Sequence, residues 1–309
     1  MLQGQGTTFR RLALVGLGHI GASISLAAQR AGMVEAIVGT DASPVVRDRA
    51  LAIGLVSQCP ATPAEAVVGA DLVILCTPPS AFASVAAAIA PHLAPGAIVT
   101  DVGSIKAAAV AAIQPHLPPH VHFVLGHPIA GTEHSGPDSG LTTLFDGRWT
   151  ILTPLDDSAP EAVARLTAFW EALGSKVATL APDRHDLVLA TTSHLPHLIA
   201  YCIVGTADDL QAVTRSEVIK YSAGGFRDFT RIAASNPDMW RDVFLANREA
   251  VLEMLGRFTQ DLSTLEALVR EGDGAALHAF FTRTRAIRRS IIDAGQDSAA
   301  PDFGRHRPS

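Results

Sequence analysis

The sequence is poor in cysteine and in charge, and it has no strongly basic balance. Its three cysteines, Cys59, Cys76 and Cys202, lack C-x-x-C spacing, so neither a disulfide framework nor a zinc site is predicted. Each is instead expected to be a small buried hydrophobic side chain. Charged residues make up 17% of the chain, and the formal net charge is −6. This balance argues against nucleic acid or an anionic membrane as a partner.

The chain also lacks a long uninterrupted apolar run. Prolines break its most apolar stretches at Pro78, Pro79, Pro91 and Pro95, so no membrane span is predicted. The first residues, MLQGQGTTFRR, contain no apolar segment typical of a signal peptide. A hydrophobic fraction of 48% over 309 residues allows a sizeable core in two domains. Together these absences predict a soluble, reduced, cytoplasmic protein without a bound metal.

A glycine motif follows the first apolar run. Residues 12–16, LALVG, are typical of a buried parallel strand and lead into GLGHIG, which places Gly16, Gly18 and Gly21 in the pattern G-x-G-x-x-G. The next segment, ASISLAAQRAG, has helical spacing and a predicted C-cap at Gly32. In this pattern the glycines permit a tight turn, close approach of a pyrophosphate and helix packing. The free N–H groups of the helix then favour phosphate, so the motif predicts dinucleotide binding.

An acidic residue follows the second apolar run, AIVGT. Asp41 lies about twenty residues beyond Gly21, where a carboxylate accepts hydrogen bonds from the adenosine ribose. A carboxylate there would repel a 2′-phosphate, which favours NAD over NADP. Four further residues are expected at the cofactor site: His19, Ile20, Thr77 and Pro78.

Strand-like and helical segments alternate through the first half of the chain. Strands are predicted at 71–76, 97–101, 121–125, 149–153 and 176–180, and helices at 82–90, 106–114 and 160–173. This alternation predicts an α/β Rossmann-type domain with a doubly wound parallel sheet over residues 1–181.

The strand pattern stops at residue 182. Helical periodicity appears over 183–204, 207–222, 237–270 and 273–294. We therefore expect an all-α substrate and dimerisation domain over 182–295, followed by a frayed tail at 296–309. Its long apolar helices favour burial against a second copy, so a homodimer is expected.

Polar residues follow the predicted strands, at the sheet edge where ligands bind in such folds. Thr77 to Ser80 follow the strand predicted at 71–76. The motif DVGSIK places Asp101, Ser104 and Lys106 at the end of the strand predicted at 97–101, at the mouth of the site. The motif GHPIAGTEHSG places His127 just past the end of the strand predicted at 121–125.

The predicted helical half contributes two further polar motifs. SHLPH puts His194 and His197 on one helix face. GGFRDFTRIAASNPDMW brings together Arg227, Arg231 and Trp240. A guanidinium suits a carboxylate ligand because it offers two parallel charged hydrogen bonds.

The motifs GLGHIG, TPPSAF, DVGSIK, GHPIAGTEHSG, SHLPH and GGFRDFTRIA occur in this order. Together they resemble those of the prephenate/arogenate (cyclohexadienyl) dehydrogenase family of tyrosine biosynthesis, over nearly the whole chain. The resemblance implies NAD-dependent oxidative decarboxylation of prephenate or arogenate, in which hydride passes to the nicotinamide and the ring loses CO2. It also implies a minimal two-domain form, without a chorismate mutase segment or a regulatory domain.

The resemblance implies a role for each polar residue at the reacting carbon. His127 would accept the hydrogen bond of the ring hydroxyl, which suits a neutral imidazole near pH 7. Ser104 would hold the same hydroxyl, orient His127 and border the cofactor. Ser104 is also placed to be the N-cap of the following helix, and both roles can hold together.

The resemblance places the remaining residues around the substrate. Arg231 would bind a carboxylate, His197 would lie near the side chain and Trp240 would border the pocket. Three alternatives stay open: Arg227 pairs with Asp228 or sits at a helix end, His194 bonds the backbone, and Trp240 is a core residue. Thr132 and Glu133 are expected in a loop that covers the pocket.

Two other functions fit parts of the sequence. Another two-domain NAD(P)-dependent reductase, such as a β-hydroxyacid dehydrogenase or a pyrroline carboxylate reductase, typically has a lysine in the helical domain or other glycine motifs. A non-catalytic NAD-binding regulator could keep the glycine turn without Ser104, His127, His197 and Arg231, which are all present here. The sequence leaves open the choice between prephenate and arogenate.

Overall fold

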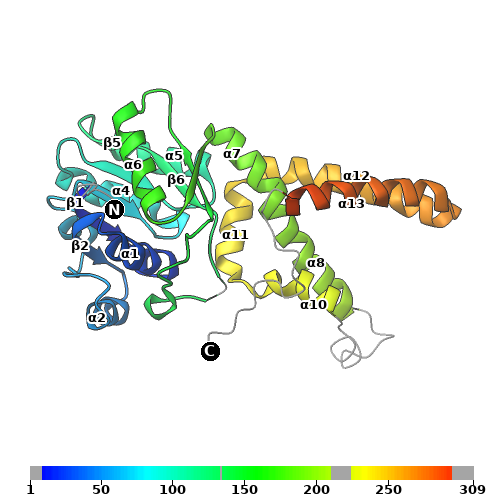
Figure 1. Ribbon diagram of the computed structural model, residues 1–309, viewed down its shortest axis with the longest axis horizontal. Helices are drawn as coiled ribbons and strands as arrows, with labels where there is room; N and C mark the ends of the chain where they lie inside the picture. Colours follow the sequence, from blue (N-terminus) through cyan, green and yellow to red (C-terminus); the bar gives the residue numbers. More distant parts are fainter. Residues whose placement is uncertain (1–8, 133, 210–223, 294–309) are drawn as a thin grey trace. The chain divides into compact units, whose positions relative to one another are not determined.

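The computed structural model describes residues 9–132, 134–209 and 224–293, and its first sheet has five parallel strands (Figure 1). In spatial order these are β2 (Val34–Thr40), β1 (Phe9–Val15), β3 (Leu72–Leu75), β4 (Ile98–Asp101) and β5 (His122–Phe123). The chain moves outward from β1 to β2 and then returns to place β3 on the other side of β1. Ligands bind at such a reversal, outside the carboxyl ends of the strands. The predicted doubly wound parallel sheet is confirmed.

Helices cover both faces of this sheet. Residues of α1 (His19–Ala31), α2 (Pro44–Ala52) and α6 (Pro160–Ala172) share one buried cluster. Residues of α4 (Phe82–Ile89) and α5 (Lys106–Ile113) share a second one, beside α3 (Pro63–Ala66). Strand β1 explains the two clusters, because Leu12 and Leu14 enter the first and Ala13 and Val15 the second. Alternate side chains of a strand point to opposite faces, so a continuous apolar run buries both.

This domain also contains short 3₁₀ helices. Three of them flank the helices of the second cluster, and a fourth lies in the segment after the first sheet. They are η1 (Pro79–Ala81), η2 (Ala90–His92), η3 (Gln114–His116) and η4 (Pro137–Ser139).

A second, three-stranded sheet follows the first one. Strand β6 (Leu125–Pro128) pairs antiparallel with β7 (Trp149–Thr153), which pairs parallel with β8 (Lys176–Thr179). The single strand predicted at 121–125 is therefore wrong, because the chain leaves the first sheet at Val124 and changes partner. His127 also lies inside β6, opposite Ile151, rather than past a strand end. An apolar run marks an extended segment but does not show which strand it pairs with.

Helical segments make up the described residues from 182 onward, as predicted. A π-helical segment η5 (Ala190–His194) joins α7 (Pro182–Leu189) to α8 (Leu195–Asp209). After them come α10 (Gly224–Thr230), the 3₁₀ turn η6 (Arg231–Ala234) and α11 (Pro237–Ala246). Most of the helix predicted at 207–222, and the tail predicted at 296–309, lie outside the described residues. The helix predicted at 237–270 is broken at Asn247, where α11 ends and α12 (Arg248–Glu271) begins.

The chain divides into two compact units, Met1–Val251 and Leu252–Ser309. The described part of the second unit is a helix pair, formed by α12 beyond Val251 and α13 (Gly274–Asp293). Gly272, with a φ of 69°, ends α12 in the left-handed conformation that glycine adopts easily. The domain boundary expected between residues 181 and 182 stays a prediction.

The expectation that the cysteines are buried needs correction. Cys202, on α8, is exposed rather than buried, and Cys59 and Cys76 are only partly buried as whole residues. Among the described residues one helix, Pro182–Asp209, is long and apolar enough to cross a membrane by length and composition. The sequence predicted no such span because prolines break the other apolar stretches, whereas Pro196 lies in the first turn of α8 without ending the helix. Length and composition alone do not separate a membrane span from a helix packed against protein.

Candidate active site

Close backbone contacts shape the glycine turn between β1 and α1. Gly16 has a φ of 101°, and a Cβ atom there would lie 2.6 Å from the carbonyl oxygen of Cys76. A Cβ atom on Gly21 would collide with the carbonyl oxygen of Gly16. Both positions therefore require glycine. Gly18, the N-cap of α1, differs because a Cβ atom there would meet no atom within 4 Å.

This turn fits the pyrophosphate of a dinucleotide. The N–H groups at the start of a helix have no partners within the helix and attract anions. The first turn of α1 contains no acidic residue to repel a phosphate. Thr77, just after β3, adds a second feature, because its Oγ1 is buried and has no hydrogen-bond partner among the described residues. Buried polar atoms are rarely left so, and a ligand could supply the bond. The next residue, predicted Pro78, is the N-cap of η1.

The carboxylate of Asp41 faces the glycine turn from the end of β2. Its Oδ2 accepts a hydrogen bond from the N–H of Leu17 at 3.0 Å, and its Oδ1 accepts one from the N–H of Ser43 at 3.0 Å. The predicted acid therefore also braces the turn. Each carboxylate oxygen can accept two hydrogen bonds, so capacity remains for ribose hydroxyls, and that role stays a prediction.

His19 and Ile20, also predicted at the cofactor site, both pack into the protein. His19 is 8% exposed, and its Nδ1 donates to the carbonyl oxygen of Ser139 at 2.8 Å. Burial lowers the pKa of His19, so the ring is neutral at pH 7. Ile20 is partly buried against the core of the first sheet. His19 thus ties α1 to the segment after β6, and the cofactor roles of both residues stay predictions.

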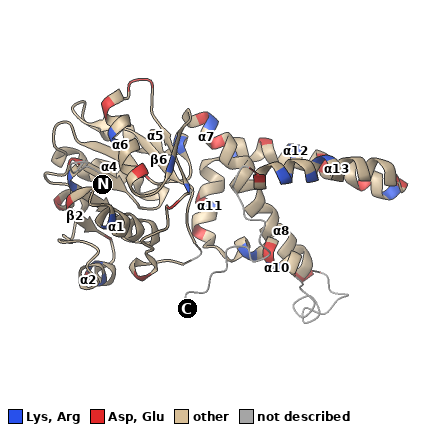
Figure 2. Ribbon diagram, in the orientation of Figure 1, with Lys and Arg blue, Asp and Glu red and all other residues tan. Residues whose placement is uncertain are grey.

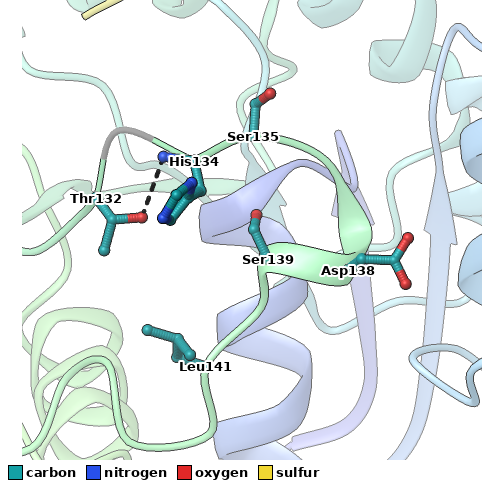
Figure 3. Close-up of a pocket in the computed structure, with 6 residues that line it drawn as sticks. All are labelled: Thr132, His134, Ser135, Asp138, Ser139 and Leu141. Atoms are coloured by element: carbon teal, nitrogen blue, oxygen red, sulfur yellow. Dashed lines mark hydrogen bonds between the residues drawn. The ribbon is translucent and has the colours of Figure 1, made fainter. Parts of the chain in front are cut away.

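The segment after β6 borders an open pocket of about 620 Å³ (Figure 3). Polar side chains belong to all but one of its lining residues, which are Thr132, His134, Ser135, Asp138, Ser139 and Leu141. Arg49 of α2 forms an ion pair with Asp138 at 2.5 Å, which fastens the segment to the first sheet's helices. Thr132, predicted in a covering loop, lies here; Glu133 lies outside the described residues. The bond between His19 and Ser139 places the pocket beside the glycine turn.

A buried ion pair lies beneath the ends of β4 and β6. Asp101 and Lys106 were expected at the mouth of the site, but both side chains are 0% exposed. The Lys106 Nζ donates to Asp101 Oδ2 at 2.7 Å and to the carbonyl oxygen of Gly126 at 2.6 Å. Asp101 also accepts hydrogen bonds from the N–H groups of Gly103 and Gly126. Burial lowers the pKa of Lys106, and Asp101 opposes that shift. Because both side chains bond the backbone of Gly126, the pair supports the strand that carries His127.

Ser104 is not the N-cap of α5, which corrects one of its two expected roles. The N-cap is Ile105, and its side chain makes no capping bond. Asp186 of α7 caps α5 instead, because its Oδ1 and Oδ2 accept the N–H groups of Lys106 and Ala107 at 2.7 and 2.8 Å. A carboxylate from a distant segment thus satisfies the first turn of α5. The expected role of Ser104 beside the substrate stays a prediction.

His127 is held by a second histidine that sequence reasoning missed. Its Nδ1 lies 2.9 Å from Nε2 of His185, and Nδ1 of His185 lies 2.8 Å from Oδ1 of Asp186. Burial lowers the pKa of His127 well below its usual value, and the Lys106 cation lowers it further. His127 is therefore a neutral imidazole at pH 7, as a base requires.

His194 and His197 both contact Trp240, as expected for residues on one helix face. The His197 ring stacks on Trp240 with centroids 3.6 Å apart, and the His194 ring meets it edge-on at 6.1 Å. His197 Nδ1 lies 2.9 Å from the carbonyl oxygen of Ser193, and burial lowers the pKa of His197. Trp240 is 7% exposed, so it belongs to a small core as well as to the surroundings of His197.

His194 has a side-chain partner rather than the backbone bond considered above. Its Nδ1 lies 3.1 Å from Nδ2 of Asn247, which also donates to the carbonyl oxygen of Asp186 at 2.9 Å. Burial lowers the pKa of His194 to about 4. The Nε2 of His194 and the Nε1 of Trp240 are buried without partners among the described residues. These donors could serve a bound ligand.

The two arginines differ in their surroundings. Arg227 is 63% exposed in its side chain and lies 3.6 Å from Asp228, which is the ion pair considered as its alternative. Arg231 begins η6, and its charge lowers the pKa of His197, so it lies on the side of the site that carries the SHLPH motif.

The residues that sequence reasoning missed are His185, Asp186 and Asn247. All three are buried polar side chains in the helical segments. The sequence offered only a weak signal for them. His185 and Asp186 are two adjacent polar residues near the start of the helix predicted at 183–204, and Asn247 lies inside the helix predicted at 237–270. Neither pattern shows that these side chains meet His127 and His194.

The chain is similar to known proteins over both of its parts. Residues 24–179 match the family model of the nucleotide-binding domain of prephenate dehydrogenase, and residues 181–283 match that of its dimerization domain. The chain is 39% identical over 285 residues to cyclohexadienyl dehydrogenase of Zymomonas mobilis, with 92% of this chain and 97% of the relative covered.

Two solved structures resemble the chain over most of its length. Prephenate dehydrogenase of Aquifex aeolicus, in complex with hydroxyphenyl propionate and NAD⁺, matches with a TM-score of 0.84 at 34% identity, covering 91% of this chain and 98% of that one. Arogenate dehydrogenase of Synechocystis matches with a TM-score of 0.78 at 29% identity, covering 91% and 99%.

Proposed function

The chain belongs to the prephenate dehydrogenase family, and on that premise we propose how its own residues carry out the reaction. It is an NAD-dependent oxidoreductase that oxidises and decarboxylates prephenate, arogenate or both, in tyrosine biosynthesis. When bound, NAD accepts the hydride from the ring carbon that bears the hydroxyl, and the ring carboxylate leaves as CO2. Gly16, Gly18 and Gly21 would hold the pyrophosphate and Asp41 the adenosine ribose, with Thr77 on the nicotinamide side.

His127 is the base that takes the hydroxyl proton. The observation that carries this assignment is a neutral imidazole, held through Nδ1, in a buried network beside the end of β4. As the hydride leaves, the hydroxyl becomes a carbonyl and loses its proton, which a neutral imidazole can accept. Ser104, in the turn after β4, would hold the same hydroxyl.

Cationic and polar groups of the helical segments would bind the rest of the substrate. Arg231 would pair with a carboxylate, because a guanidinium matches its two oxygens. His197, stacked on Trp240, would lie near the side chain that distinguishes prephenate from arogenate. Arg227 and His194 would contribute at the edges of the same site.

Formation of NADH with prephenate and with arogenate tests this function. We expect turnover with one or both substrates, and the ratio of kcat/KM gives the preference. The His127→Asn variant should lower kcat by about 10²–10⁴-fold, as for loss of a general base, with little change in NAD affinity. Turnover equal to that of the natural enzyme would remove His127 from the mechanism, and no turnover with either substrate would refute the function.

The enzyme would act as a homodimer through its helical domain. The match of residues 181–283 to a dimerization domain supports this. Several apolar side chains are exposed in the single chain: Ile203, Val204, Leu252, Leu262, Val269, Phe281, Ile287 and Ile291. Figure 2 shows that α8 carries no blue residue and is coloured red only toward its end, so a partner could cover it without burying charge. Sedimentation should find a dimer at micromolar concentration; a monomer alone would contradict this. The cytoplasmic location stays a prediction.

A further inference from the structure

Two side chains of α7 continue a chain of hydrogen bonds from His127. His127 in β6 contacts His185 in α7 through Nδ1 and Nε2, 2.9 Å apart. His185 contacts the adjacent Asp186 through Nδ1 and Oδ1, 2.8 Å apart. His185 is 0% exposed and Asp186 is 4% exposed, so water does not compete for these bonds.

The direction of each bond follows from Asp186. Its two carboxylate oxygens accept the backbone N–H groups of Lys106 and Ala107 at 2.7 and 2.8 Å. An ionised carboxylate only accepts hydrogen bonds. The hydrogen between Asp186 and His185 therefore lies on Nδ1 of His185.

The hydrogen on His127 follows in turn. A neutral imidazole with its hydrogen on Nδ1 has a lone pair on Nε2. Because Nε2 of His185 faces Nδ1 of His127, the hydrogen in that bond must come from His127. Nε2 of His127 is then the nitrogen that keeps a lone pair.

We propose that His185, oriented by Asp186, is a positioning residue that fixes His127 in the tautomer with hydrogen on Nδ1. Nε2 of His127 is thereby the atom that takes the substrate proton. This inference rests on the proposed function of His127. A free neutral imidazole exchanges between two tautomers, so the bond selects the one that can act as base. The same bond fixes the plane of the ring.

Burial keeps His185 neutral, which the proposal requires. A protonated His185 would donate from Nε2 and force His127 into the wrong tautomer. Burial lowers the pKa of His185 and the Lys106 cation lowers it further, while Asp186 and Asp101 raise it, with a net lowering. On the side of the π-helical segment lies His194, which faces Asn247 and has its own pKa lowered to about 4.

Nuclear magnetic resonance of the NAD-bound natural enzyme, labelled with ¹⁵N-histidine, tests the tautomer directly. The His127 signals are those missing from the His127→Asn variant. We expect Nδ1 of His127 to carry the hydrogen and Nε2 to be unprotonated at pH 7.5. The reverse pattern would overturn the proposal.

A matched pair of variants tests the consequence for catalysis. His185→Leu removes the acceptor for His127, and we expect kcat to fall by about 10²-fold, since loss of a group that sets a catalytic histidine's tautomer and position has effects of this order or larger. His185→Gln offers an amide oxygen near the place of Nε2, so its kcat should recover to within about tenfold of the natural value. Melting temperature and NAD affinity, measured alongside, separate catalytic loss from misfolding.

The outcomes separate this inference from the proposed function. If His127→Asn loses turnover but both His185 variants keep it, the positioning role is wrong and the base assignment stands. If both His185 variants lose turnover equally, with the His127 signals unchanged from the natural enzyme, His185 has only a packing role. If His127→Asn keeps full turnover, the proposed function itself fails.

Discussion

The glycine turn and the histidine cluster of His127, His185 and His194 are built in different ways. In the turn, residues 16–21 act through backbone geometry, and a side chain at Gly16 or Gly21 would collide with a carbonyl oxygen. In the cluster, side chains from β6, α7 and the π-helical segment meet through hydrogen bonds, with Asn247 between α11 and α12 as a further partner. The turn is local in sequence, whereas the cluster joins residues as far apart as His127 and Asn247.

This difference changes what holds each part in place. The turn needs only the strand before it, the helix after it and the braces from Asp41 and β3. The cluster depends on Lys106 and Asp186, whose charges are buried and satisfied by several partners. Buried charges tolerate loss of a partner poorly, because the remaining charge stays desolvated. The cluster should therefore be the more fragile of the two.

The largest expected effect comes from Lys106→Met. The substitution leaves the Asp101 carboxylate buried without its cation, so the free energy of unfolding should fall by about 3–5 kcal/mol. Denaturant titration measures it. The control is Lys176→Met, at an exposed lysine 5.8 Å from the Trp149 ring, which should cost less than about 1 kcal/mol.

A double variant checks the cause. Removing both charges, in Asp101→Leu with Lys106→Met, should recover part of the lost stability, since no unpaired charge then remains. If Lys106→Met costs no more than Lys176→Met, the ion pair does not support the cluster.

A smaller effect is expected from acid. An unfolded histidine binds a proton below its ordinary pKa of 6.5, whereas burial lowers the folded pKa of His194 to about 4. Between these values the unfolded state binds more protons, so stability is lost as the pH falls. His194 alone should lower the free energy of unfolding by about 3 kcal/mol between pH 7 and pH 4. His127 and His185 shift in the same direction.

Unfolding titrations at several pH values, at one protein concentration, measure this slope. His194→Gln should flatten part of it, because glutamine does not titrate. His116→Gln, at an exposed histidine of η3, should keep the slope of the natural protein. Equal slopes in all three proteins would show that His194 is not kept neutral by the fold.

The same contrast explains what the sequence could predict. The strand, glycines and helix of the turn follow one another in the chain, and the predicted C-cap Gly32 has the expected left-handed φ of 63°. The polar motifs also singled out His127, His194 and His197, whose roles at the site stay predictions. Local pattern sufficed wherever partners lie within one strand and helix.

Features that depend on distant partners could not be predicted. Nothing in the run VHFVLGHP shows that the chain changes sheets at Val124, which places His127 inside β6. Ser104 has the right residue type and position for an N-cap, yet Asp186 caps α5 from a segment some eighty positions later. Which carboxylate reaches a helix N-terminus is decided by tertiary packing, and propensity describes only the local preference.

The smallest expected effect on stability distinguishes two glycines of the turn. In Gly21→Ala the new Cβ atom collides with the carbonyl oxygen of Gly16, and such overpacking should cost about 1–3 kcal/mol of unfolding free energy. In Gly18→Ala the Cβ atom meets nothing within 4 Å and φ is −73°, so stability should stay equal or rise by up to about 1 kcal/mol.

Although Gly18→Ala should be the more stable of the two variants, we expect it to bind NAD more weakly than the natural protein does. The Cβ atom of Gly18→Ala projects into the open space at the N-terminus of α1, where the pyrophosphate would lie. We expect the Kd for NAD to rise by about tenfold or more, equivalent to about 1.4 kcal/mol, in a protein as stable as the natural one. Calorimetric titration of the folded variant measures it. Unchanged affinity in Gly18→Ala would mean that the cofactor does not approach the backbone at this turn. The glycine turn would then serve only in packing, as Lys106 and Asp186 do beneath the histidine cluster.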